Sequence, residues 1–146
     1  MTTDAVDALQ KVWLFQGLDR TRLSRLARSF TERELPAGSV IVEQGQTSGI
    51  GFFILVEGEA AVTVDGREVA KLRPGDHFGE IALLSDRVRT ATVTALTDVR
   101  VLVMVVWDFR AYVRGDPEVA WKLLQHVAGL LHARQPEHEL SVSEAP

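Results

Sequence analysis

Cysteine is absent from the 146-residue chain, which excludes a disulfide framework and zinc sites built on thiolates. The sequence also has no continuous run of about 18 apolar residues, which a membrane-spanning helix would need. Its first residues lack the basic start and apolar segment of a secretory signal peptide. From these absences we expect a cytoplasmic protein that does not enter the membrane.

A surplus of basic residues is also lacking. Lysine and arginine number 16 against 20 aspartates and glutamates, a formal net charge of -4, whereas binding a phosphate backbone needs a clustered positive excess. Direct DNA binding is therefore not expected. The hydrophobic content of 46% is typical of a globular chain. We predict one domain over residues 1–135, followed by a flexible tail over residues 136–146.

Catalytic motifs are missing as well. The sequence has no Walker-type GxxxxGK loop for nucleotide phosphates, and no arrangement of Ser, His and Asp that indicates a catalytic nucleophile. His77 after Pro-Gly-Asp is similar to a metal motif of cupins, but the paired H-x-H ligands of such a site are lacking and the other histidines, His126, His132 and His138, lie at the C-terminal end. We predict no metal, no catalytic cofactor and no enzymatic activity, with a cupin-type metal enzyme as the less favoured alternative.

What the chain does have is a helix–strand–helix order. Helical spacing of apolar residues predicts helices over residues 4–15, behind Thr2, Thr3 and Asp4 as N-caps, and over residues 18–30, with Asp19 as N-cap. Short β-branched runs separated by Gly, Pro and Asp turns predict strands near residues 39–44, 51–58, 60–65, 68–73, 90–96 and 99–106. Asp65-Gly66 is the strongest hairpin signal.

The helical period returns after Trp107. A short helix to about Arg114 and a longer one to about Arg134 are predicted, with Asp116 as N-cap and Pro117 in the first turn. The whole pattern predicts an α+β fold. In it an antiparallel β-roll or jelly roll, also called a double-stranded β-helix, is flanked by N-terminal helices and a C-terminal helix.

One stretch, PGDHFGEIALLSDRVRTATVT over residues 74–94, carries chemistry. Glu80 to Leu84 suits one helical turn, whose free N–H groups and dipole favour an anion. Arg89 could donate two charge-assisted hydrogen bonds to the same anion, and Thr90 a hydroxyl. Glu80 fits only as an acceptor from hydroxyl groups beside the anion. Phosphate and sugar hydroxyl together indicate a nucleotide.

These residues resemble a known family. The stretch FGEIALLSDRVRTATVTA is similar to the phosphate-binding cassette of the cyclic nucleotide-binding domain, which catabolite-activator-type regulators, cyclic-nucleotide-dependent kinases and gated channels share. A second likeness covers VIVEQGQTSGIGFFILVEGEAAV, where the segment from Gly45 to Gly58 is one residue longer than the common pattern. The resemblance spans about residues 6–134. It implies a cyclic nucleotide site formed by Phe78, Gly79, Glu80, Ile81, Ala82, Leu83, Arg89, Thr90 and Ala91.

In this resemblance Glu80 accepts from the ribose 2′-hydroxyl, Arg89 pairs with the cyclic phosphate, and the N–H groups of Ala82 and Leu83 complete the phosphate site. Cyclic AMP is preferred over cyclic GMP as ligand. Base contacts are implied at Leu130, Arg134 and Gln135. The C-terminal helix would close over the base or pair with a second copy in a homodimer.

We therefore expect a stand-alone cyclic nucleotide sensor, with binding as the input and an unidentified effector protein or a change in oligomerisation as the output. Catabolite-activator-type relatives carry a helix-turn-helix after the long helix, and this chain ends about where that segment would begin. Two other interpretations stay open. Glu80 and Arg89 taken alone are typical of a surface ion pair, and a cassette that has lost its ligand would make a ligand-free interaction domain.

Overall fold

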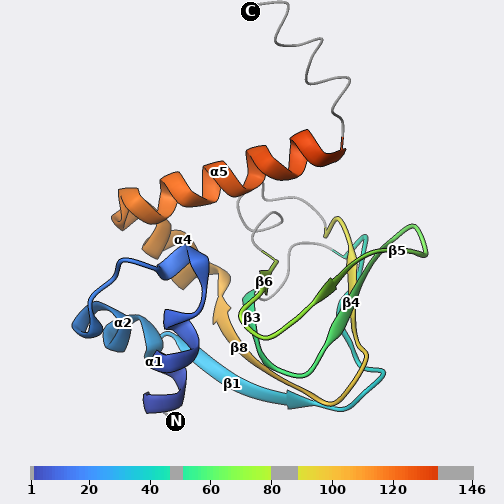
Figure 1. Cartoon of the computed structure of the whole chain (residues 1–146), viewed down its shortest axis with the longest axis horizontal. Helices are drawn as coiled ribbons and strands as arrows, with labels where there is room; N and C mark the ends of the chain where they lie inside the picture. Colours follow the sequence, from blue (N-terminus) through green and yellow to red (C-terminus); the bar gives the residue numbers. More distant parts are fainter. Residues whose placement is uncertain (1, 47–50, 80–88, 135–146) are drawn as a thin grey trace, which may run out of the picture. The chain divides into compact units, whose positions relative to one another are not determined.

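The computed structural model describes residues 2–46, 51–79 and 89–134. Contacts divide the chain into two compact units, Met1–Tyr112 and Val113–Pro146. The first unit holds all the described strands and most of the helices (Figure 1). The second holds the last residues of α4 (Val106–Gly115) and α5 (Pro117–Arg134). Residues 136–146 lie outside the described residues, so the tail and the domain limits stay predictions.

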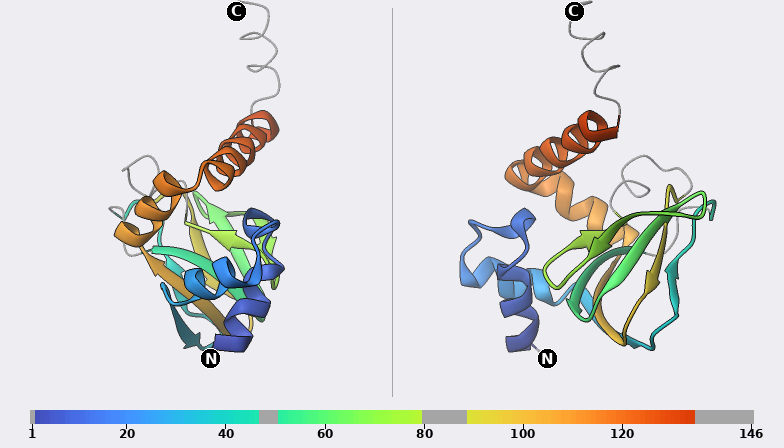
Figure 2. Two further views of the ribbon diagram at one scale, coloured as in Figure 1. Left: turned by 90° about the vertical axis from the view of Figure 1, so that its left-hand side faces the viewer. Right: turned by 45° about the vertical axis from the view of Figure 1, so that its right-hand side comes forward.

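The strands form a roll beside the N-terminal helices (Figures 1 and 2). It consists of two four-stranded antiparallel sheets. The first has the order β1-β8-β3-β6 and the second β2-β7-β4-β5. The strands are β1 (Phe30–Leu35), β2 (Val40–Val42), β3 (Gly51–Glu57), β4 (Ala60–Val64), β5 (Arg67–Leu72), β6 (His77–Phe78), β7 (Thr92–Ala95) and β8 (Val99–Val105). The antiparallel roll with flanking helices that the sequence predicts is confirmed.

Strand β3 shows why the roll has two apolar layers. Alternate side chains of a strand point to opposite faces of the sheet. All of Gly51 to Leu55 is buried, so both faces of β3 are covered. Phe53 belongs to the core cluster between the sheets, with Leu55, Phe78, Val93 and Val101 among its members.

Phe52, on the other face of β3, packs against the helices. It stacks on Phe109 of α4 with ring centroids 4.8 Å apart. Phe15 meets it edge-on at 6.3 Å and also meets Phe30 at 6.5 Å. A cluster of aromatic rings therefore fixes the N-terminal helices and α4 to the outer face of the first sheet.

The first helix is shorter than the sequence predicts. A single helix over residues 4–15 is wrong: α1 covers Thr2–Gln10 and a 3₁₀ turn covers Trp13–Phe15, with Val12 extended between them at φ -81°. The chain turns there because Val12, Leu14 and Phe15 are then all buried, which one straight helix does not achieve. Thr3 and Asp4 lie inside α1 and are not its caps.

The Asp65-Gly66 hairpin is confirmed, and so is the second helix, although it is shorter than the predicted range 18–30 and Phe30 already belongs to β1. Helix α2 covers Arg20–Ala27, and the Asp19 side chain accepts from the Arg22 N–H at 2.8 Å, as an N-cap should. Strands β4 and β5 pair across Asp65-Gly66. Asp116 caps α5, its Oδ1 accepting from the Val119 N–H at 3.4 Å.

Two strands escape the sequence analysis. The charged segment FTEREL forms β1, which pairs with β8 along its whole length from Phe30↔Met104 to Leu35↔Val99. It is an edge strand in which half of the residues are exposed and only Phe30 is buried, so the apolar alternation is lost. Strand β6 has only His77 and Phe78, too few to leave a pattern.

Candidate functional site

Arg89 is the centre of the candidate site. It precedes β7, and its backbone continues the pairing of β7 with β2: the Arg89 N–H donates to the Gln46 carbonyl at 2.8 Å, and the Gly45 N–H donates to the Arg89 carbonyl at 3.0 Å. The residue is 4% exposed. Because these hydrogen bonds hold its backbone, the sheet determines the direction in which the buried Arg89 side chain leaves the chain.

The guanidinium of Arg89 donates to two backbone carbonyls. Nη1 reaches the Gly79 oxygen at 3.0 Å and Nη2 the Gly51 oxygen at 3.1 Å. Carbonyl oxygens replace part of the water that a buried cation loses. They carry no formal charge, so these two contacts orient the positive charge without cancelling it.

Gly79 is required at this contact for two reasons. Its φ of +96° is strained for any other residue, and a Cβ there would lie 2.7 Å from the Gly51 oxygen and 2.9 Å from Arg89 Nη1. Gly79 thus combines close backbone approach with a positive φ. The glycine lets the backbone come within hydrogen-bond distance of the arginine.

The turn before the site is anchored to β3. The Gly75 N–H donates to the Leu55 carbonyl, and the Leu55 N–H donates to the Asp76 carbonyl, both at 2.9 Å. Phe78 then stacks on Phe53 with ring centroids 4.9 Å apart and an interplanar angle of 5°. The Pro-Gly-Asp turn and the stacked ring of Phe78 together place Gly79 beside Arg89.

Only part of the predicted site lies in the described residues. Thr90 is exposed and Ala91 half-buried, next to Arg89. Glu80, Ile81, Ala82 and Leu83 lie outside the described residues, as do Gln135 and part of the longer turn after Gly45. In the second unit Leu130 is half-buried on α5 and Arg134 is the last residue of that helix. The roles given to all these residues stay predictions.

Sequence reasoning missed Gly51 as a partner of Arg89. A backbone carbonyl has no side-chain signature, so the only signal is a glycine at the first position of a strand. That glycine is needed, because a Cβ on Gly51 would lie 2.5 Å from the Met104 oxygen. The tight packing against β8 holds the Gly51 carbonyl in place for Arg89.

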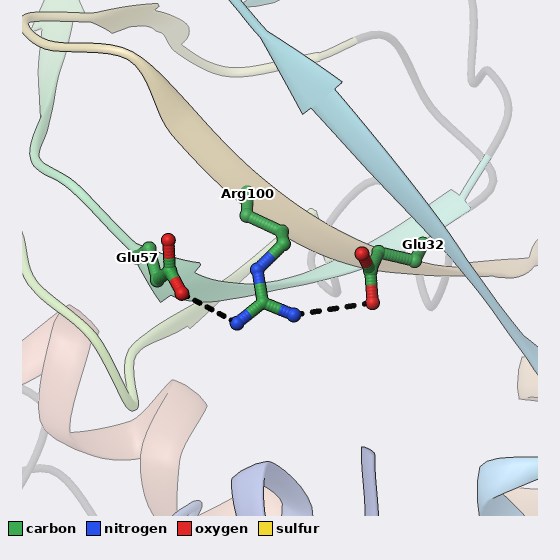
Figure 3. Close-up of polar contacts among 3 residues, drawn as sticks. All are labelled: Glu32, Glu57 and Arg100. Atoms are coloured by element: carbon green, nitrogen blue, oxygen red, sulfur yellow. Dashed lines mark hydrogen bonds and ion pairs between the residues drawn. The ribbon is translucent and has the colours of Figure 1, made fainter. Parts of the chain in front are cut away.

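A second arginine site lies at the opposite end of β3. Arg100 of β8 lies between Glu57 of β3 and Glu32 of β1 (Figure 3). Nη2 donates to Glu57 at 2.6 Å and Nη1 to Glu32 at 3.2 Å. The hydrogen bond to Glu57, followed by the attraction of both carboxylates, raises the pKa of Arg100.

The groove beside Arg100 does not suit a phosphate. It has a volume of about 360 Å³ and is lined by the carboxylates of Glu34, Glu57 and Asp98 together with Leu35, Pro36, Val99 and Arg100. Three carboxylates against one arginine make it acidic, so an anion is repelled there. The Arg89 end of β3 is therefore the better place for a negatively charged ligand.

Within residues 2–46, 51–79 and 89–134, His, Asp and Glu side chains do not gather in groups of three that would suit a metal ion. His77 packs against Phe52 with ring centroids 5.5 Å apart. Across the same ranges, helices fall short of the length and apolar character that crossing a bilayer requires.

Known proteins match this chain in sequence and in fold. A cAMP-dependent protein kinase regulatory subunit from Mycosarcoma maydis is 39% identical over 135 residues, which is 87% of this chain and 24% of that protein. A cyclic nucleotide-gated potassium channel from Rhizobium etli is 39% identical over 107 residues, 73% of this chain and 30% of that protein. The chain thus spans less than a third of these relatives.

Solved structures agree. The regulatory domain of Toxoplasma gondii PKA, crystallised with cAMP, has a TM-score of 0.76 and 28% identity, covering 88% of this chain and 49% of that one. The catabolite activator protein of Thermus thermophilus has a TM-score of 0.70 and 30% identity, covering 90% and 62%. The family model for the cyclic nucleotide-binding domain matches residues 32–116. This chain belongs to the cyclic nucleotide-binding domain family.

Proposed function

We propose that this chain is a cytoplasmic sensor that binds a 3′,5′-cyclic nucleotide reversibly, without converting it chemically. The observation that carries the proposal is the buried, carbonyl-oriented guanidinium of Arg89. The family resemblance implies a phosphate partner for Arg89, which follows the segment of Glu80, Ala82 and Leu83 in the sequence. A cyclic phosphate has one negative charge and oxygens that an arginine fork can hold.

The proposal is tested by titration calorimetry with cyclic AMP, using two matched variants. Arg89→Lys keeps a positive charge and most of the volume but loses the planar fork, so affinity should fall by roughly 10-fold or more. Arg100→Lys makes the same change at the other end of β3 and should bind within about 2-fold of the native chain. Equal effects from both variants, or no binding by a folded native chain, would refute the proposal.

Cyclic AMP is the ligand we propose over cyclic GMP. It is named for the kinase regulatory subunits among the relatives. Thr90 is exposed, and its hydroxyl is a group to which the amino group of guanine can donate a hydrogen bond. This residue therefore favours cyclic GMP as the competing ligand. Competition between the two nucleotides measures the preference directly, and Thr90→Ala should weaken cyclic GMP more than cyclic AMP.

The output we propose is a change in partner binding or self-association through α5. That helix carries Trp121, Leu124 and Leu131 with more than half of each side chain exposed, an apolar stripe that an effector or a second copy could cover. The proposal predicts that saturating cyclic AMP changes the hydrogen exchange of α5 or the oligomeric state in light scattering. A protein that binds the nucleotide and changes in neither measurement contradicts it.

A further inference from the structure

The side chain of Gln44 is hydrogen-bonded to the tip of the β4–β5 hairpin. Its Nε2 donates to Asp65 Oδ1 at 2.9 Å, and its Oε1 accepts from the Asp65 backbone N–H at 2.8 Å. One amide group thus makes two complementary hydrogen bonds with a single residue. In Figure 2 this hairpin tip lies near the end of β2, where Gln44 follows the strand.

Asp65 has a backbone conformation that non-glycine residues rarely adopt. It has a φ of +53° and is the one non-glycine residue with positive φ in the described part of the chain. With Gly66 at +78° it forms the tight hairpin turn between β4 and β5. The bond from its N–H to Gln44 therefore fixes both the turn and the distance from the turn to the Gln44 segment.

The same segment holds the backbone of Arg89. The Gln44 N–H donates to Thr92 Oγ1 at 2.9 Å. The next two residues, Gly45 and Gln46, make the two backbone hydrogen bonds with Arg89. Gln44 is thus the residue before the two that pair with the Arg89 backbone. Its side chain connects this segment to the tip of the β4–β5 hairpin.

We propose that Gln44 is a positioning residue for the anion site: by clamping the Asp65 turn it holds residues 44–46, and through them Arg89, in the geometry that binds the phosphate. This rests on the proposed function, since it assumes that Arg89 receives that phosphate. An arginine fork loses much of its binding when its backbone shifts by a fraction of an ångström, because both donors must stay aligned.

Three variants separate positioning from mere structure. Gln44→Ala removes both hydrogen bonds. Gln44→Glu keeps an acceptor for the Asp65 N–H but sets two carboxylates against each other. The double variant Gln44→Glu with Asp65→Asn reverses the donor and the acceptor, so that the asparagine amide donates to the glutamate. It has the same net charge as the native pair, and asparagine tolerates the positive φ.

Gln10→Ala is the control. Gln10 is an exposed glutamine at the end of α1, outside the segment that pairs with Arg89. The control therefore removes the same side chain without changing a contact of residues 44–46.

Two measurements are made on each variant: cyclic AMP titration, and hydrogen exchange of the Arg89 amide in the nucleotide-free protein. Losing one or two partly exposed hydrogen bonds should weaken binding by roughly 3- to 10-fold in Gln44→Ala and speed the Arg89 exchange similarly. Gln44→Glu should be at least as weak. The double variant and Gln10→Ala should lie within about 2-fold of the native chain.

The proposal is overturned if Gln44→Ala and Gln44→Glu leave affinity and Arg89 exchange unchanged, or if the double variant does not recover what Gln44→Glu loses. The two measurements also separate this inference from the proposed function. If the native chain binds no cyclic nucleotide, the function fails. The exchange of the Arg89 amide then still shows whether Gln44 holds the segment.

Discussion

Arg89 and Arg100 are both largely shielded arginines at opposite ends of β3, but they are held differently. Arg89 donates to the carbonyl oxygens of Gly51 and Gly79. Arg100 donates to the carboxylates of Glu32 and Glu57. Carboxylates cancel a positive charge and carbonyls only orient it, so the two sets of bonds differ in kind: those to Gly51 and Gly79 hold a guanidinium to backbone, and those of Arg100 join β8 to β1 and β3 through charge.

The comparison teaches that two arginines beside one strand differ most in the chemistry of their partners. Arg89 is 4% exposed and the Arg100 side chain 19%, so both are largely shielded. A change at one end of β3 therefore has the other end, or a neighbouring position, as its reference.

The largest effect is expected from truncating the arginines. Arg89→Ala removes the fork for the phosphate and should weaken cyclic AMP binding by roughly 100-fold or more, as for other buried charge partners. Arg100→Ala should leave the affinity within about 2-fold. Calorimetric titration of the two variants measures both values, and a comparable loss in Arg100→Ala would remove the distinction drawn above.

A smaller effect is expected from two glycines with the same backbone conformation. Gly75 and Gly79 have φ of +99° and +96°, so an alanine costs about 1–2 kcal/mol at either from strain alone. Only at Gly79 would its Cβ press on Arg89 Nη1, whereas at Gly75 the nearest atom is the Lys11 oxygen at 3.9 Å.

Gly79→Ala should therefore lose about 1–3 kcal/mol more than Gly75→Ala in urea unfolding, from overpacking. It should also bind cyclic AMP about 10-fold more weakly, because the guanidinium is displaced. Equal unfolding free energies and equal affinities for the two variants would show that the Gly79 contact with Arg89 does not matter.

The smallest effect is the salt dependence of the Arg100 network. Arg100→Ala should lower the free energy of unfolding by about 1 kcal/mol at low ionic strength. In about 1 M NaCl that loss should shrink, because the Debye length falls to about 3 Å. Arg33→Ala, an exposed position on β1, is the reference. A loss at Arg100 that is unaffected by salt would mean that packing, not charge, explains its role.

Much of the fold was predictable where a local signal coincided with the tertiary structure. Asp65-Gly66 requires the positive φ that the turn has, and Asp19 caps the helix that follows it. Strand β1 was not predictable in this way, because its partner β8 is about 70 residues away and its own charges resemble a loop or helix. The break at Val12 is likewise set by burial from other elements.

The candidate site divides in the same manner. Gly79 and Arg89 are recognisable because their side chains, or the lack of one, carry the chemistry. The Gly51 carbonyl and the Gln44 clamp are not, since one is backbone and the other depends on a residue 21 positions away. Sequence motifs identify the groups that touch a ligand better than the groups that hold those groups in place.

The contacts of Arg89 also have a kinetic consequence. They join it to residues 10 and 38 positions earlier in the chain, whereas the β4–β5 hairpin closes through neighbouring residues. Hairpins form in about 1–10 μs and contacts across longer loops follow more slowly. We therefore expect the Arg89 contacts to form after the β4–β5 hairpin as the chain folds, and before or together with the pairing of β1 with β8, which spans about 70 residues.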